Sequence, residues 1–242
     1  MPSLLDFTNE LLGGLIVTVQ IAVLSILGCA ITSLVLGVLT ASKKLPSQLT
    51  GRIAVEILRG TSVVVYLFWV YYALPLIPGM PSLSAFSASV LVISLVAGGY
   101  GAEIVRAGIA AIPAGQIDAC HALGLTGWQL LIRVVIPQAV SQIVPAFGSL
   151  AVDVVKWTTV VSFVGVSDLF YVANAVRTIT FDTISIYGLL ALIYIVLCTI
   201  TSLFFRAIEW FLPLNRALRA SRRPHGILIK PAPLFSRMKV KS

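Results

Sequence analysis

Long apolar stretches separated by short polar segments dominate the pattern of the chain. Five stretches reach the length of about 20 residues that a helix needs to cross a bilayer, over residues 14–40, 53–73, 85–107, 145–166 and 186–205. The fourth is interrupted by Pro145, Asp153 and Lys156, which leaves open a shift toward Val172 or a broken or re-entrant helix. The pattern predicts an all-α polytopic membrane protein with about five transmembrane helices.

The composition agrees with a membrane location. Of the 242 residues, 58% are hydrophobic and 11% are charged, whereas about a quarter of the residues in a soluble domain are charged. The first apolar run follows the acidic residues Asp6 and Glu10. A secretory signal would have a basic segment there, so we expect this run to remain as a membrane helix.

The positive charges fix the predicted orientation. If the N-terminus lies outside, Arg177 is the one basic residue on the outer side. Basic residues concentrate on the cytoplasmic side of membrane proteins, so we expect an N-out, C-in topology. The net charge of +8 therefore reports orientation and does not indicate binding to nucleic acid. The inner basic residues are Lys43, Lys44, Arg52, Arg59, Arg106, Arg133, Arg206 and every Lys and Arg from Arg216 to Lys241.

This topology divides the chain into a transmembrane region, residues 1–213, and a basic cytoplasmic tail, residues 214–242, which we expect to be flexible. The transmembrane region contains one long cytoplasmic loop, at about residues 108–138. In this loop Pro113 and Gly115 are expected to break the third span, and Asp118–Leu123 to form a short helix that ends at Gly124. A second short helix over 128–135 is expected to stop at Pro137.

The loop resembles a known signature. The residues Asp118-Ala119-Cys120, Gly124 and Val134-Val135-Ile136-Pro137 keep every gap of the EAA loop of permease subunits of ATP-binding cassette (ABC) importers. Asp, Cys, Val and Ile replace the Glu, Ala, Ile and Leu of that pattern. An amphipathic loop lying on the membrane is the alternative interpretation, but the preserved gaps favour the coupling loop. Its predicted coupling residues are Gly115, Gln116, Asp118, Ala119, Cys120, Ala122, Leu123, Gly124 and Pro137.

The resemblance implies a set of partners. The chain contains no G-x-x-x-x-G-K-[ST] motif, so ATP and Mg would be bound by a pair of separate ABC ATPase subunits that receive the coupling loop. A second permease subunit, either the same chain or a homologue, and an extracytoplasmic solute-binding protein would complete an importer in the bacterial cytoplasmic (inner) membrane. The chain itself would be a multi-pass transporter subunit and not an enzyme.

Further matches narrow the resemblance. The segments 56–61, 100–108, 115–116 and 156–159 are similar to the polar amino acid branch of type I importers. Within that branch, the stretch from Lys156 through Asp168-Leu169 and Asp182-Thr183 to Tyr187-Gly188 most resembles permeases for ectoine and hydroxyectoine, which are zwitterionic compatible solutes. The resemblance therefore implies import of a small polar amino acid or of such a solute.

Three acid-base pairs at i,i+3 spacing lie in or near spans: Glu56 with Arg59, Glu103 with Arg106, and Asp153 with Lys156. This spacing places both members on one helix face, and charges inside a membrane usually line a wet interior or pair with one another. Asp153 and Lys156 could bind a zwitterion or pack helices together, and both interpretations stay open. The candidate translocation residues are Glu56, Arg59, Thr61, Asp153, Lys156, Thr158, Thr159 and Ser162.

Other functions receive less support. An ion-coupled secondary transporter is the main alternative, but no internal repeat is evident. A membrane-embedded enzyme lacks a clustered nucleophile and base. His121 has no nearby partner for a metal or proton-relay role and is expected to be a polar interface residue, and the three cysteines show no metal or disulfide spacing.

Overall fold

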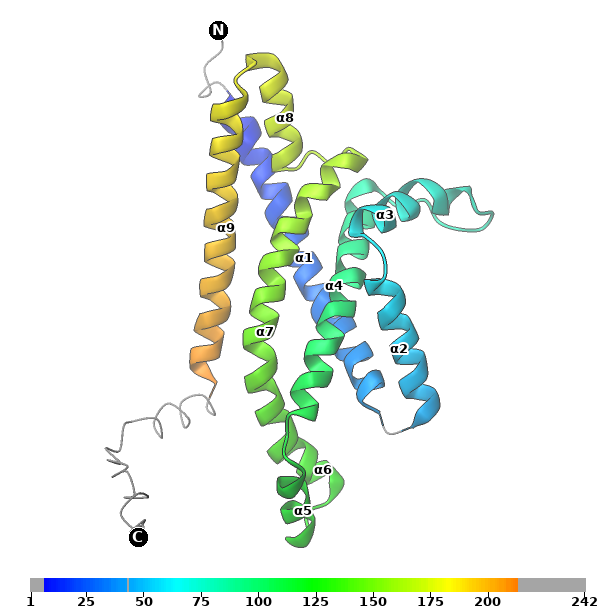
Figure 1. Ribbon diagram of the computed structural model, residues 1–242. Helices are drawn as coiled ribbons and strands as arrows, with labels where there is room; N and C mark the ends of the chain where they lie inside the picture. Colours follow the sequence, from blue (N-terminus) through cyan, green and yellow to red (C-terminus); the bar gives the residue numbers. More distant parts are fainter. Residues whose placement is uncertain (1–6, 43, 213–242) are drawn as a thin grey trace, which may run out of the picture.

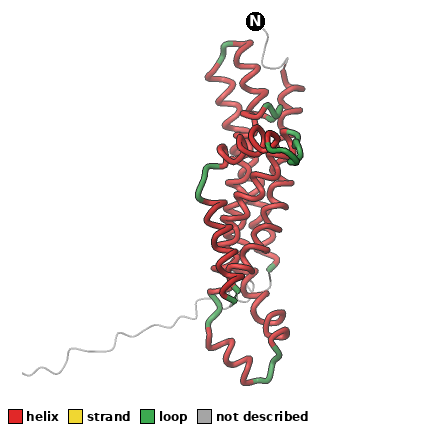
Figure 2. The backbone as a smooth tube through the Cα atoms, turned by 90° about the vertical axis from the view of Figure 1, so that its right-hand side faces the viewer, coloured by secondary structure: helices red, strands yellow, loops and turns green. Residues whose placement is uncertain are grey.

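The computed structural model describes residues 7–42 and 44–212, and in these ranges all regular structure is helical. The predicted tail lies outside them. The helices form an elongated bundle (Figures 1 and 2). The α-helices are α1 (Thr8–Ala41), α2 (Leu45–Arg59), α3 (Val63–Phe68), α4 (Ala85–Ala110), α5 (Ala114–Ala122), α6 (Gly127–Leu130), α7 (Ile136–Trp157), α8 (Leu169–Thr180) and α9 (Thr183–Phe211). Two π-helical turns, η2 (Trp69–Ala73) and η4 (Leu131–Val135), and two 3-10 segments, η3 (Leu74–Leu76) and η5 (Thr158–Val164), extend them.

The prediction of an all-helical membrane protein with about five spans is confirmed. Four helical stretches of the described chain are long and apolar enough to cross a membrane, namely 8–41, 85–110, 127–164 and 183–211, and a bent pair over 45–76 makes a fifth if it counts as one span. The start of α1 and the loop containing α5 and α6 lie at opposite ends of the bundle (Figure 1). The N-out prediction requires the start of α1 and this loop to lie on opposite sides of the membrane, and their arrangement is consistent with it.

The second span is broken, so the predicted continuous helix over 53–73 is wrong. The chain turns by 95° between α2 and the helical stretch that begins with α3. Gly60 ends α2, and Ser62 caps α3 by accepting a hydrogen bond from the N–H of Val64. A glycine followed by a capping hydroxyl stops one helix and starts another, although the stretch over 45–76 is long and apolar enough to count as one span.

The fourth span starts earlier than predicted. The helix does not stop at Pro137, because this proline lies in the first turn of α7 directly after the π-helical turn η4. A π-helical turn shifts the local hydrogen-bond pattern, which lets a helix continue through a residue that has no N–H to donate. The span therefore runs through α6, η4, α7 and η5, with Pro145 inside α7, and the glycine that follows it, Gly165, has a φ of 80°.

The core is formed by α1 packed on α4, with glycines at the contact. A Cβ atom added to Gly37 of α1 would lie 2.6 Å from the side chain of Val105 on α4, and one added to Gly98 would lie 2.5 Å from Thr32. The hydroxyl of Ser33 donates to the carbonyl of Gly98 at 3.3 Å. Small residues let membrane helices approach closely, and here they join the first and third spans.

A second cluster holds α8, which the sequence analysis did not foresee, against α1 and α9. Leu169, Ala173 and Val176 of α8 pack with Ile186 and Leu190 of α9. Asp168 caps α8 by accepting hydrogen bonds from two backbone N–H groups, those of Phe170 at 3.3 Å and Tyr171 at 3.0 Å. This cluster lies at the same end of the bundle as the start of α1 (Figure 1).

Candidate functional site: a loop at one end and a groove between spans

The loop at the end of the bundle is built around a sharp turn at Gly124. Its φ is 73°, which glycine adopts without steric cost. The N–H of Gly124 donates to the carbonyl of His121 at 3.0 Å, and the N–H of Leu125 donates to that of Cys120 at 3.1 Å. This pair of hydrogen bonds is the Schellman arrangement that closes the end of a helix. The predicted end of the short helix at Gly124 is confirmed.

Two further contacts make the loop a defined structure. Thr126 and Gln129 form a capping box at the start of α6. The side-chain amide of Gln138, in the first turn of α7, donates to the side chain of Gln116 on α5 at 2.8 Å. This hydrogen bond joins α5 to the start of α7 in the fourth span. Sequence reasoning missed Gln138, because a contact across 22 residues leaves no periodic signal.

The predicted coupling residues lie together on α5 and at its two ends, and most of them face solvent. Asp118, Ala119 and Ala122 are exposed, and Cys120 is half-buried. Leu123 is 80% exposed and Trp128, beyond the turn, is 70% exposed. Large exposed apolar side chains of this kind mark a surface that contacts another protein or the membrane. Gly115 and Gln116 are in the first turn of α5, and Pro137 lies in the first turn of α7.

A groove with a volume of about 830 Å³ lies between α7 and α9. Asp153 and Lys156 line it, and their side chains form an ion pair at 3.1 Å. The exposed fractions are 59% for the Lys156 side chain and 51% for that of Asp153. Hydroxyl groups also line the groove, from Ser149 on α7 and from Thr199 and Ser202 on α9.

These hydroxyl residues were missed by the sequence analysis. Ser149 is four residues before Asp153, so it lies on the same face of α7, and this spacing was the available signal. Thr199 and Ser202 are on another span. The sequence does not show which span faces the ion pair, so their place in the groove emerges only from the packing of α7 on α9.

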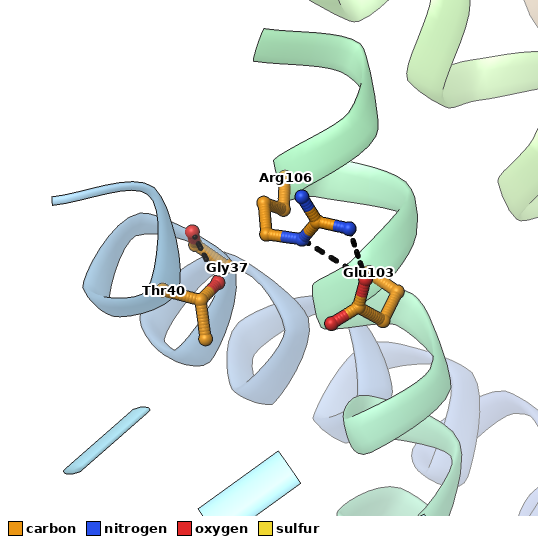
Figure 3. Close-up of polar contacts among 4 residues, drawn as sticks. All are labelled: Gly37, Thr40, Glu103 and Arg106. Carbon is orange, nitrogen blue, oxygen red and sulfur yellow. Dashed lines mark hydrogen bonds and ion pairs between the residues drawn. The ribbon is translucent and has the colours of Figure 1, made fainter. Parts of the chain in front are cut away.

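Of the other two predicted ion pairs, one forms in the structure and one does not. Arg106 donates to one carboxylate oxygen of Glu103 through Nε at 2.9 Å and Nη2 at 2.7 Å, close to the end of α1 that carries Gly37 and Thr40 (Figure 3). In the described chain Glu56 and Arg59 form no ion pair, so the predicted pairing of these two residues is wrong. The Arg59 guanidinium instead lies over the ring of Tyr100, 5.0 Å from its centroid.

The remaining path candidates do not gather in the groove. Thr158 is buried and its hydroxyl donates to the carbonyl of Val155 at 2.8 Å. Thr159 and Ser162 also donate to backbone carbonyls of their own helix, each at 2.9 Å. Thr61 is exposed at the break between α2 and α3. Of the predicted translocation residues, Asp153 and Lys156 therefore lie in the groove. The predicted hydroxyl residues Thr61, Thr158, Thr159 and Ser162 do not line it.

Comparisons with known proteins identify the chain's family. Residues 33–210 match the family described as "Binding-protein-dependent transport system inner membrane component". The chain is 36% identical to the "Probable amino-acid ABC transporter permease protein y4tF" of Sinorhizobium fredii, over 84% of this chain and 87% of that protein. It is 32% identical to the "L-cystine transport system permease protein TcyB" of Bacillus subtilis, with the same two coverages.

A solved structure agrees with these matches. The "Crystal structure of an amino acid ABC transporter with histidines" contains a chain that superposes with a TM-score of 0.78 at 30% identity, covering 86% of this chain and 99% of that one. The chain thus belongs to the binding-protein-dependent transport system inner membrane components, as a multi-pass inner-membrane permease subunit of an amino-acid ABC importer whose ATPase lies in a partner subunit.

Proposed function

We propose that the chain, paired with a second permease subunit that is either a copy or a homologue, imports a small zwitterionic solute through a path that includes the groove between α7 and α9. The main support for this proposal is the ion pair of Asp153 and Lys156, whose side chains are half-exposed within a membrane-spanning region. Charges at this depth are expensive in hydrocarbon, so they have to face water or protein.

The chemistry of the groove suits a zwitterion. A carboxylate of the solute can pair with Lys156 while its cationic group pairs with Asp153, so both charges exchange one partner for another. Three of the four hydroxyl residues that line the groove, Ser149, Thr199 and Ser202, supply further donors and acceptors. The volume of about 830 Å³ lies within the range of roughly 300–1,000 Å³ typical of small-molecule sites.

Two substrate classes follow from the family and the sequence. The relative from Bacillus subtilis is named for L-cystine, which favours an amino acid, whereas the similarity over residues 156–188 favours ectoine or hydroxyectoine. Both classes carry one carboxylate for each cationic group. We propose ectoine and hydroxyectoine as the first solutes to test, with cystine and glutamine as competitors.

The experiment is uptake of labelled solute into proteoliposomes that contain the whole importer. Lys156→Gln and Asp153→Asn are expected to lower uptake at least about tenfold and to leave the permease associated with its ATPase. Glu10→Gln is the control, because it removes a membrane-helix carboxylate in the first turn of α1, outside the groove. Equal loss of uptake and assembly in the Lys156 and Asp153 variants would show that this pair only packs helices.

The coupling loop has a separate test. In the alternating-access mechanism, ATP draws the two ATPase subunits together and the seated α5 helices transmit this motion to the spans. Gly124→Val places a β-branched residue at positive φ, which costs about 1–2 kcal/mol, and is expected to uncouple ATP hydrolysis from uptake. Gly127→Ala is the control, since a Cβ there meets nothing within 4 Å. Tightly coupled uptake by the Gly124 variant would contradict the assigned role.

A further inference from the structure

The helices α2 and α4, which touch where Arg59 lies over Tyr100, carry a set of polar residues that the groove does not include, called here the polar stripe and defined as Arg52, Glu56, Arg59, Tyr100 and Glu103. The α2 members are spaced by four and three residues and therefore share one helix face. All three are exposed in this chain, as is Tyr100, and Glu103 is half-buried. A stripe of this polarity along two membrane helices cannot face lipid chains, so it faces water or another protein surface.

Arg59 is the deepest charge of this stripe. It is the last residue of α2, which begins at Leu45 and has 15 residues. At 1.5 Å per residue, Arg59 lies roughly 21 Å along the helix from its cytoplasmic start, against a hydrocarbon core of about 30 Å. Arg59 forms no ion pair within the described chain. An unpaired guanidinium at this depth points to a binding function.

The side chain of Arg59 is held in place. Its guanidinium lies over the ring of Tyr100 at 5.0 Å, and Tyr100 contacts Trp157 of α7 with the ring centroids 5.8 Å apart. Close packing supports this arrangement, because a Cβ on Gly99 would lie 3.0 Å from Leu58 and 3.4 Å from Arg59. A guanidinium over a ring engages the ring through its face, so its in-plane N–H groups stay available.

The stripe ends at Arg59 because the second span breaks there. After Arg59 the chain turns by 95°, and Thr61 and Ser62 are exposed at the turn. The hydroxyl of Tyr66, on α3, donates to the carbonyl of Ile57, near the end of α2, which joins the two sides of the break. Arg59 thus lies at the end of the stripe that is farther from the coupling loop (Figure 1).

We propose that Arg59, held over Tyr100, binds the carboxylate of the transported solute at the end of the stripe that lies farther from the cytoplasm. This inference rests on the proposed import of a zwitterion and adds a second carboxylate-binding residue on a different span from Lys156. Planar guanidinium groups match carboxylates through two parallel N–H bonds. The residue would therefore select solutes that carry a carboxylate over uncharged analogues.

The test measures carboxylate preference on the purified permease–ATPase complex without its binding protein, so that the binding protein's own selectivity does not enter. The probes are ectoine with its carboxamide and glutamine with its α-amide, in equilibrium competition. Wild type is expected to prefer the acid at least about tenfold, and Arg59→Gln is expected to reduce that preference to about twofold or less. Arg59→Lys is expected to recover part of it.

Matched variants separate binding from packing. Arg52→Gln removes a charge from the same stripe, two turns nearer the cytoplasm, and is expected to keep the preference. Tyr100→Phe keeps the aromatic face and is expected to resemble wild type, whereas Tyr100→Leu is expected to lower the preference.

The outcomes distinguish the two proposals. An unchanged preference in Arg59→Gln overturns the role of Arg59 and leaves import of a zwitterion intact. Loss of association between the two permease subunits in the same variant would show that Arg59 pairs with the partner permease, and it also overturns the inference. Failure of wild type to bind either acid overturns the inference together with the proposed function.

Discussion

At the scale of single residues, Gly37 shows how close α1 and α4 lie. Its missing side chain leaves room for Val105, a buried β-branched residue with little rotamer freedom. Gly13, in the same helix, has nothing within 4 Å of a built Cβ. Two glycines of one helix therefore have different structural roles, and substitution separates them.

Gly37→Ala is expected to lower the free energy of unfolding by about 1–3 kcal/mol relative to Gly13→Ala, because the new methyl forces the two helices apart. Gly13→Ala is expected to raise it slightly, since alanine favours helix more than glycine does. Titration of the detergent-purified protein with a denaturing detergent measures both. A Gly37 variant as stable as the Gly13 variant would contradict the close packing.

At the scale of elements, α8 depends on Asp168. The carboxylate caps the helix, and the adjacent N–H of Leu169 donates to the hydroxyl of Thr18 on α1 at 3.0 Å. Asp168 lies between the fourth span and α8, and burial raises its pKa from about 3.8 to about 6, against the opposing effect of the backbone N–H groups.

The raised pKa predicts a pH dependence with a definite sign. The contribution of Asp168 to the free energy of unfolding is fully present at low pH, where the carboxyl group is protonated in both the folded and the unfolded protein. It falls as the pH rises from about 4 to about 6. Asp168→Asn keeps a good cap without the charge. Above about pH 7 this variant is expected to be more stable than wild type, by up to about 3 kcal/mol, and the advantage should vanish near pH 4.

Thermal unfolding of the purified protein across this range measures the effect. Asp168→Ala, which removes the cap, is expected to be less stable than Asp168→Asn at every pH. Wild type that gains stability relative to Asp168→Asn as the pH rises from about 4 to about 6 would contradict the burial of the charge.

The elements also show what the sequence could predict. Long apolar runs located α1, α4 and α9 to within several residues, because a membrane helix needs length and hydropathy and little else. They could not reveal the 95° turn after Arg59, because Gly60 and Ser62 act through local backbone geometry. Nor did they reveal α8, whose twelve residues are too few for a span and become helical through a cap and packing on two neighbours.

The candidate site divides in the same way. The coupling loop could be predicted because its residues are contiguous and its turn needs a glycine. The groove could be predicted only for Asp153 and Lys156, which share one helix. The contact of Arg59 with Tyr100 joins two spans and two residues that are 41 positions apart in sequence. Local spacing suggested Glu56 as the partner of Arg59 and could not reveal this contact.

At the scale of the whole molecule, the orientation can be tested directly. Phe181, between α8 and α9, is 88% exposed, and Leu123, on the coupling loop, is 80% exposed. In a chain whose native cysteines are replaced by serine, a membrane-impermeant maleimide is expected to label Phe181→Cys in right-side-out vesicles. Leu123→Cys is expected to react only after permeabilisation. Labelling of Leu123→Cys in sealed vesicles would reverse the topology and remove the basis for the coupling role.

The length of α1 has a consequence for the surrounding lipid. Its exposed apolar side chains extend from Leu12 to Val38, roughly 39 Å along the axis, whereas the hydrocarbon layer is about 30 Å thick. A tilt of about 40° removes this mismatch, and α1 does cross the bundle obliquely (Figure 1). Since α4 is fastened to α1 through their glycines, a thinner or thicker bilayer would rotate both together. We therefore expect the tilt of this helix pair to follow the acyl-chain length of the host membrane.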